Sequence, residues 1–584
     1  MGAASTRALG AVGGVLTAAV AIGTAQFASG LGVPASSPVV AVGQAAIDLA
    51  PPPVKDFAIS AFGTNDKTAL LGGILVVLVL YAAVVGMLAV RRLAIGLGGL
   101  AVFAALGLSA ALTRPDATVG YVFPTLAGAA AGAVALTWLA RAAVRLGSPL
   151  DPLFPPDPRP ELTDPASPAS PASPAWQAWR PGSDQTVPPP RPGPADRTGP
   201  VARAGPAYSF TGPAHADDQQ PSRWPARRWF LFSSAASAAV AALGTLAGRN
   251  LANEHNIAVD RSALRFPRPA VPAPPLPTGS NLALPGLSPF VTPDQRFYRV
   301  DTALLVPQVD PSAWRLRIHG MVQREVTITF DDLVRRPLIE AWITLTCVSN
   351  PVGGPYVGNA RWLGASLAGL IRQARPLAGA TQLLCTSVDG FTSGTPIETV
   401  LDGRDALLAV AMNGTPLPIE HGFPARMVVP GLYGYVSATK WVTDIEVTTF
   451  AAARAYWVQR DWAQQAPIKT ESRIDVPAGG AELAPGRTAV AGVAWAQHKG
   501  IAAVEVRLNG GPWHPARLAS VPGIDTWRQW VWDWSAEPGN YQIEARATDA
   551  TGYTQTAVQA DTIPNGASGY PSAQVTVRSS LVRT

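Results

Sequence analysis

Four apolar stretches in the first 146 residues constrain this 584-residue chain more than any other feature. They lie at about residues 8–30, 68–90, 93–113 and 121–140. Each has close to the roughly 20 residues that an α-helix needs to cross a bilayer, and Gly, Ala and Val are frequent in them, as in helices that pack closely in lipid. The sequence therefore predicts a four-helix membrane domain over residues 1–146. The first stretch could instead be a secretory signal peptide, although it is long for one and further spans follow it.

Arginines beside these stretches predict their orientation. With the N-terminus in the cytoplasm, most of the flanking arginines lie on the cytoplasmic side, as the positive-inside rule requires. Those that follow the rule are Arg7, Arg91, Arg92, Arg141 and Arg145, and Arg114 is the exception. The loop 31–67 is then expected outside, with a short amphipathic segment. No His, Asp, Glu or Lys lies inside the spans. A haem site or proton relay between helices needs such residues, so we expect an anchor.

A proline-rich stretch, residues 147–226, follows the membrane helices. Residues 149–200 alone hold 17 of the 57 prolines, and such a composition cannot bury a core. We expect a cytoplasmic linker, which serves either as a spacer or as a docking site for a proline-reading domain.

The segment 227–248 begins with Arg227-Arg228-Trp229-Phe230-Leu231 and continues as an alanine-rich apolar run. It is either a plain fifth transmembrane segment or one that also carries a twin-arginine export signal, which serves folded proteins. Both interpretations place the remaining chain on the outer face of a cell membrane. We therefore predict a multi-pass membrane protein with about five transmembrane helices.

Beyond residue 275 the pattern changes to short alternating strands separated by Gly/Pro turns. Residues 275–465 predict an α+β domain dominated by strands, with helices at 330–336 and 363–373. Residues 470–575 contain alternating stretches at regular spacing, which is typical of an immunoglobulin-like β-sandwich. The tryptophans of this last region are expected in its core and interface.

Composition excludes several kinds of site. Two cysteines exclude a disulfide-stapled scaffold and a cysteine-rich zinc or iron–sulfur site. Six histidines exclude a histidine-rich metal tract, and the lack of a CxxCH motif excludes covalent haem. The net charge of +6 sits mainly beside apolar runs, which favours membrane topology over nucleic-acid binding. Cys347 ends a strand-like run. Taken alone, it is either a small buried side chain or a disulfide partner of Cys385.

Further motifs accompany Cys347, and together they carry a resemblance. They are Phe290-Val291-Thr292-Pro293 with Phe297-Tyr298-Arg299, Gly358-Asn359-Ala360-Arg361-Trp362, the block M-N-G-x-P-L-P-x-x-H-G-F-P-x-R at 412–426, the turn 431–435 and Lys440-Trp441. At these residues the chain resembles the sulfite oxidase family of molybdopterin-dependent oxidoreductases, over roughly residues 280–570. The implied fold class is multidomain: an N-terminal α-helical membrane bundle, an α+β sulfite-oxidase-like molybdopterin domain, and an immunoglobulin-like β-sandwich.

The resemblance implies a molybdenum–molybdopterin cofactor. Cys347 would be the metal ligand, because a high-valent metal centre favours an anionic thiolate. Trp362 would be a catalytic residue beside the substrate pocket. The anionic phosphate of the cofactor needs charged donors. The implied cofactor-binding residues are Tyr298, Arg299, Asp389, His421, Arg426, Gly434 and Lys440.

The chain also departs from the family's sulfite oxidases. Arg299 is followed by Val300-Asp301 instead of Asn-His, and Asn350-Pro351-Val352 replaces Asn-Arg-Arg, which removes a cation expected to hold sulfite. Trp462 stands where the family has its catalytic tyrosine. We therefore expect two-electron oxygen-atom transfer on a small molecule other than simple sulfite. The alternatives are a sulfoxide reductase-type activity and a cofactor-free, membrane-anchored immunoglobulin-like binding protein.

The expected partners follow from the same observations. The sequence has no haem, flavin or iron–sulfur motif, so electrons must pass to a separate electron-transfer partner. We further expect contact with membrane lipids and no nucleic acid. The resemblance implies a homodimer through the C-terminal domain.

Overall fold

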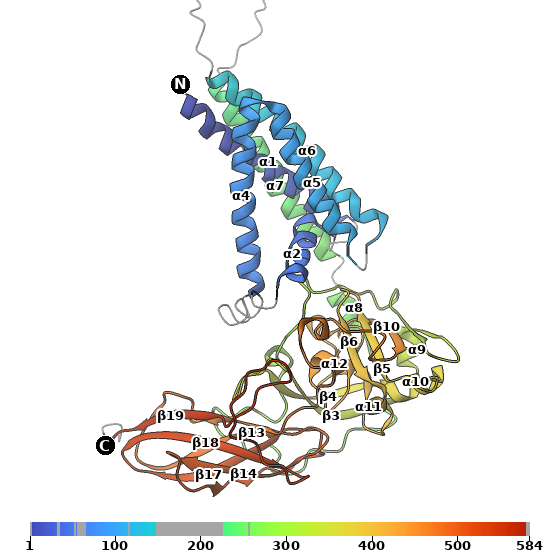
Figure 1. Cartoon of the computed structure of the whole chain (residues 1–584), viewed down its shortest axis with the longest axis vertical. Coiled ribbons are helices and arrows are strands. Elements are labelled where there is room, and N and C mark those ends of the chain that lie inside the picture. The colour runs from blue at the N-terminus through green and yellow to red at the C-terminus, as the bar shows by residue number, and fades with distance from the viewer. Residues whose placement is uncertain are drawn as a thin grey trace, which may run out of the picture.

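The computed structural model describes residues 3–31, 36–51, 54, 66–114, 117–147, 226–254 and 257–579. The predicted linker 147–226 therefore lies almost wholly outside the described residues. Two parts are visible in Figure 1, a bundle of long helices and a strand-rich region beside one end of the bundle. We call this region, residues 257–579, the outer domain, because it lies outside the helix bundle.

Five helices are long and apolar enough to cross a membrane. These helices are α1 (Ala3–Gly30), α4 (Asp66–Arg91), α5 (Leu93–Leu112), α6 (Val122–Gly147) and α7 (Ala226–Glu254). A shorter helix, α2 (Pro38–Leu49), lies between the bundle and the outer domain in Figure 1. The five helices agree with the number that the sequence predicts.

Helix α1 packs against α4, α6 and α7 through small residues. A Cβ added at Gly14 would lie 2.0 Å from the carbonyl oxygen of Ala82 in α4, and one at Gly23 would lie 2.6 Å from that of Ala241 in α7. Backbones approach this closely only where a side chain is missing. The glycines of α1 therefore fix the centre of the bundle.

The outer domain begins with an extended stretch after α8 (Ala258–Ala263), and its first part, up to about residue 465, contains two sheets. In one sheet the strand order is β2-β1-β10-β5-β6, formed by β2 (Val326–Thr329), β1 (Arg315–Gly320), β10 (Val442–Thr448), β5 (Gln382–Ser387) and β6 (Thr392–Pro396). In the other it is β3-β4-β7-β8, formed by β3 (Leu338–Thr346), β4 (Val357–Ser366), β7 (Leu407–Met412) and β8 (Thr415–Pro416), and β9 (Arg426–Val428) also pairs with β7. Helices α9 (Phe330–Val334), α10 (Leu367–Ala374), α11 (Ile397–Leu401) and α12 (Gly434–Ser437) connect them.

The last part of the chain forms two further sheets. One has the order β11-β13-β17-β16 and consists of β11 (Glu471–Val476), β13 (Gly486–Trp495), β17 (Arg528–Ala536) and β16 (Arg517–Leu518). The other has the order β12-β19-β18-β14-β15 and consists of β12 (Glu482–Leu483), β19 (Ser572–Val577), β18 (Gly539–Asp549), β14 (Ile501–Leu508) and β15 (His514–Pro515). Both sheets contribute to one core, which includes Val490 and Trp530 from the first and Val504 and Ile543 from the second. Trp495 and Trp527 instead belong to the core of the preceding domain, so they join the two parts.

The expected helix 363–373 is only partly correct. Residues 363–366 belong to β4, where Ala365 pairs with Leu338 of β3 and Leu408 of β7. Pairing with two neighbouring strands stabilises the extended conformation beyond the local helical preference. The helix starts at Leu367, after the hydroxyl of Ser366 accepts a hydrogen bond from the amide of Gly369 as an N-cap.

Candidate active site

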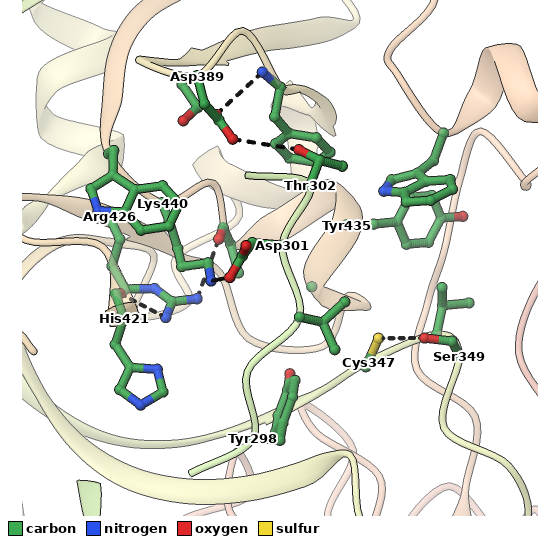
Figure 2. Close-up of a pocket in the computed structure, with 18 of the residues that line it drawn as sticks. Tyr298, Asp301, Thr302, Cys347, Ser349, Asp389, His421, Arg426, Tyr435 and Lys440 are labelled. Carbon is green, nitrogen blue, oxygen red and sulfur yellow. Dashed lines mark hydrogen bonds and ion pairs between the residues drawn. The ribbon is translucent and has the colours of Figure 1, made fainter. Parts of the chain in front are cut away.

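A cavity of about 1090 Å³, open mouth included, lies in the outer domain. Figure 2 shows that its walls differ in chemistry: Arg426, Lys440 and His421 gather on one side, and Cys347, Ser349 and Tyr435 on the other. We call the first side the basic end and the second the thiol end. Aromatic rings from Phe297, Tyr298, Phe391, Tyr435, Trp441, Trp457 and Trp462 also line the cavity.

Cys347 occupies the thiol end, directly after β3. Its amide donates a hydrogen bond to the carbonyl of Tyr356 and its carbonyl accepts one from Asn350, so the turn after the strand is fixed. The Sγ atom lies 2.9 Å from Ser349 Oγ. Burial raises the pKa of the Cys347 thiol, while the hydrogen bond from Ser349 and the charge of Lys440 act in the opposite direction. Cys385 is fully buried in the core on β5, and the two cysteines are free.

Arg426 dominates the basic end. It begins β9, is 5% exposed, and donates hydrogen bonds to the carbonyls of His421 and Ala438 at 3.0 and 3.2 Å. Within the part of the chain that the structure describes, no carboxylate lies within 4.0 Å of its guanidinium. Burial lowers the pKa of Arg426 to about 10. A buried cation without an anionic partner is costly, so this side of the cavity suits an anion.

Lys440 lies beside Arg426 and has a partner. Its Nζ is 2.9 Å from the carboxylate of Asp301, which is 4% exposed and also binds Arg299 at 2.7 Å. Burial lowers the pKa of Lys440 to about 8, and Asp301 acts in the opposite direction. Asp301 therefore keeps Lys440 charged next to the cavity.

His421 is the third member of the basic end. It is 3% exposed, and its Nε2 lies 3.1 Å from the carbonyl oxygen of Asp294. Burial lowers the pKa of His421 to about 4, and the charges of Arg426 and Lys440 add to the effect. The ring is therefore neutral at pH 7 and adds no third charge. Its Nε2–H donates to the Asp294 carbonyl, which leaves Nδ1 as a hydrogen-bond acceptor.

The remaining expected cofactor-binding residues divide into two groups. Tyr298, Asp389 and Gly434 line the cavity, and the pKa of Asp389 is raised by burial. Arg299 does not line it. Its side chain is 38% exposed and reaches the site only through Asp301.

Trp362 is placed differently from the expectation. It is fully buried in β4, and its indole N–H donates to the carbonyl of Ile343. The guanidinium of Arg426 lies 5.1 Å from its ring centroid, so Trp362 lies behind Arg426 rather than among the residues that line the cavity. In this structure Trp362 therefore contacts the cavity only through Arg426, over whose guanidinium its ring packs.

Several lining residues were not predicted as site residues. Asp301 and Trp462 are departures from the family pattern, and both line the cavity. Ser349 lies two residues after Cys347, a spacing that could have indicated a hydrogen bond to the thiol. No sequence motif around Tyr435 or Trp457 predicts a site residue, because only the folded chain brings them to the thiol end.

The residues of the cavity fit a molybdenum–pterin group. The described residues include no cluster of three or more His, Cys, Asp or Glu side chains that could hold a metal ion. A metal held by Cys347 therefore needs its other ligands from a cofactor, as dithiolene sulfurs provide. The uncompensated charge of Arg426 at the opposite end fits the cofactor's anionic phosphate.

Comparisons with known proteins give a consistent picture. A family model described as the oxidoreductase molybdopterin binding domain matches residues 303–457. The sulfite oxidase of Gallus gallus is 32% identical over 290 residues, which cover 42% of this chain and 62% of that protein. The uncharacterized oxidoreductase YuiH of Bacillus subtilis is 32% identical over 139 residues, 24% of this chain and 67% of that protein.

A solved structure, the sulfane dehydrogenase SoxCD from Paracoccus pantotrophus, superposes with a TM-score of 0.44 and 23% identity over 51% of this chain and 85% of that chain. The chain spans less than two thirds of the length of the sulfite oxidases that it matches.

The matched model and the cavity define an oxidoreductase with a molybdopterin-binding domain. The chain belongs to the sulfite oxidase family of molybdopterin-dependent oxidoreductases, and its cofactor is molybdenum–molybdopterin.

Proposed function

We propose that this protein is a membrane-anchored molybdenum oxidoreductase that catalyses two-electron oxygen-atom transfer on a small molecule other than simple sulfite. The observation that carries the proposal is one cavity with a buried thiol, Cys347, at one end and an uncompensated cation, Arg426, at the other. When bound, the cofactor supplies the oxygen-atom transfer chemistry.

The chain's own residues hold and orient the cofactor in this proposal. Because burial raises the pKa of Cys347, the thiol holds its proton in the cofactor-free protein. Ser349 and Lys440 would stabilise the thiolate that metal binding requires. At the basic end, Arg426 and Lys440 bind the anionic phosphate, and neutral His421 adds no charge there because its Nε2–H donates to the carbonyl of Asp294.

The thiol end supports a neutral substrate with an apolar group. Trp462 packs against Tyr435 and Trp457 with ring centroids 5.9 and 6.1 Å apart, and all three line the cavity. Of the described residues that line it, the cationic ones stand at the basic end, so no charged donor remains for a sulfite oxyanion. The same wall favours, as a second candidate, the reduction of neutral sulfoxides.

Substrate assays on the purified full chain test this proposal. Oxidation of sulfite and reduction of aryl and alkyl sulfoxides are measured with artificial electron carriers, and kcat/KM is compared. We expect turnover of neutral sulfoxides to exceed that of sulfite, and Trp462→Arg to shift the ratio toward sulfite by adding a cation. A wild-type preference for sulfite would overturn the assignment of the substrate class.

We propose that the outer domain is extracytoplasmic and that electrons leave to a separate partner. Support comes from the bundle: α1 begins, and α4 and α6 end, with arginines on the side away from the outer domain (Figure 1), which the positive-inside rule assigns to the cytoplasm. The Arg227-Arg228 pair stands at the start of α7 on the same side. This position suits a twin-arginine signal that exports a folded, cofactor-loaded domain.

We further propose that residues 470–575 form an immunoglobulin-like sandwich that mediates homodimer formation. The strand orders β11-β13-β17-β16 and β12-β19-β18-β14-β15 support this assignment. In chain order they correspond to the A-B-E-D sheet of that fold and to its G-F-C sheet with added edge strands.

A further inference from the structure

The segment 298–307 connects the cavity with the membrane helices. It forms neither helix nor strand, so side-chain contacts must hold it in place. Near its start, Tyr298 stacks on Phe297 and lines the cavity. In its middle, Asp301 pairs with Lys440, and the hydroxyl of Thr302 lies 3.5 Å from Asp389.

Leu304, in the same segment, is held from the membrane side. It is 9% exposed, whereas its neighbour Leu305 is 46% exposed. A Cβ added at Gly43 of α2 would lie 2.6 Å from Cδ2 of Leu304, and 3.9 and 3.8 Å from the tips of Leu71 and Ile74 of α4. The leucine side chain therefore reaches the backbone of α2 where α2 meets α4.

A hydrogen bond joins the same elements. The amide of Leu304 donates to Oε1 of Gln44 at 3.2 Å. The segment has no neighbouring strand, so the side-chain oxygen of Gln44 accepts the backbone hydrogen bond that a carbonyl would accept in a sheet. We call the surface formed by Gly43, Gln44, Leu71 and Ile74 the α2–α4 socket.

The socket lies close to the cofactor site. Leu304 is three positions after Asp301, and three extended residues span at most roughly 10 Å. Asp301 in turn holds Lys440 at 2.9 Å. The stretch between Leu304 and Asp301 is short and forms neither helix nor strand. A displacement of Leu304 should therefore also shift Asp301 and, through it, Lys440 at the basic end.

We propose that the α2–α4 socket holds Leu304 and thereby fixes the segment 298–302, of which Tyr298, Val300, Asp301 and Thr302 line the cavity. The helix bundle then positions the cofactor site as well as serving as an anchor. The inference relies on the proposed function only for the identity of the bound group. Leu304 and Gln44 are positioning residues, since neither lines the cavity.

Disulfide cross-linking tests the contact itself. The double variant Gly43→Cys/Leu304→Cys is oxidised in membrane vesicles and cut at a protease site inserted into the linker. On a non-reducing gel we expect the two fragments to remain joined, because the geometry brings the two side chains together. The matched control is Gly43→Cys/Leu305→Cys, whose second cysteine is exposed and should remain unlinked. Equal linking of both pairs, or of neither, would overturn the proposed contact.

Cofactor retention tests the consequence. Leu304→Asp places a charge in an apolar socket, which should weaken docking by roughly tenfold or more. We expect washed full-length protein to lose pterin fluorescence in this variant and to keep it in Leu305→Asp. The oxidised 43–304 pair should retain pterin, and its reduced form should lose it, which separates a positioning role from a folding defect.

The outcomes separate the two proposals. Wild-type protein without pterin would refute the proposed function and leave the cross-linking result standing. Wild-type protein with pterin, together with a Leu304→Asp variant that retains all of it, would refute only the role of the socket.

Discussion

Replacing Arg426 by methionine should weaken cofactor binding, while its effects on stability largely cancel. Methionine keeps the packing against Trp362, whose ring centroid lies 5.1 Å from the guanidinium, and removes the charge. In the cofactor-free protein the charge is uncompensated, and burial lowers the pKa of Arg426 to about 10. Since one pKa unit corresponds to about 1.4 kcal/mol, removing this buried charge should raise the free energy of unfolding by about 3 kcal/mol.

The substitution also removes two hydrogen bonds, and their loss destabilises the protein by a similar amount. The carbonyls of His421 and Ala438 lose their donor, at about 1–3 kcal/mol for an unsatisfied buried group. Two such carbonyls together cost about 2–6 kcal/mol against a gain of about 3 kcal/mol, so the free energy of unfolding of the cofactor-free protein should change by at most about 3 kcal/mol. Pterin binding should weaken by roughly 10–100-fold, because a hydrogen bond to a charged group contributes about 1.5–3 kcal/mol.

Arg473 provides the matched control. It also lies over a tryptophan, Trp527, with its Cζ 5.9 Å from the ring centroid, but it has a carboxylate partner, Asp475, at 2.6 Å. Arg473→Met should destabilise the outer domain by about 3–5 kcal/mol, because it leaves a buried carboxylate unpaired. Hydrogen exchange of amides in the outer domain measures both effects. Equal destabilisation by the two variants, or unchanged pterin binding in Arg426→Met, would refute the reasoning.

Three further predictions concern the thiol, the neutral histidine and export. Cys347→Ser should abolish turnover while pterin remains bound, whereas Cys385→Ser should keep turnover; equal losses would contradict the assigned ligand. The pKa of His421 is lowered from 6.5 to about 4, so the stability of the cofactor-free protein should fall by up to about 3 kcal/mol as pH falls through that window. His421→Gln should reduce this dependence of stability on pH. The same dependence in wild type and His421→Gln would exclude His421 as its cause. Changing Arg227 and Arg228 to Lys should leave a folded domain protected from external protease, whereas normal exposure would favour a plain fifth span.

Local patterns predicted much of the fold. The membrane spans follow from apolar length alone, so α5 at Leu93–Leu112 differs from the expected 93–113 by one residue. The alternating pattern of residues 382–387 corresponds to β5, in which every second residue from Leu383 is fully or nearly fully buried. Such elements need only their own residues to be recognised.

Long-range contacts account for what the sequence could not predict. The pairing of Asp301 with Lys440 joins residues 139 positions apart, and the bond between Gln44 and Leu304 joins residues 260 apart. Trp362 shows the same limit within a correctly recognised motif. Neighbouring side chains on a strand point to opposite faces, and only the folded sheet shows that Trp362 faces Arg426 while Arg361 pairs with Glu340.

The central claim is that Cys347 binds the molybdenum of a pterin cofactor held in this cavity. Molybdenum X-ray absorption on the purified full chain tests it most directly, because the spectrum reports the sulfur atoms bound to the metal. We predict bound molybdenum in the wild-type protein and the loss of one sulfur ligand in Cys347→Ser, with no change in Cys385→Ser. A wild-type protein without molybdenum, or identical sulfur coordination in wild type and Cys347→Ser, would contradict the claim.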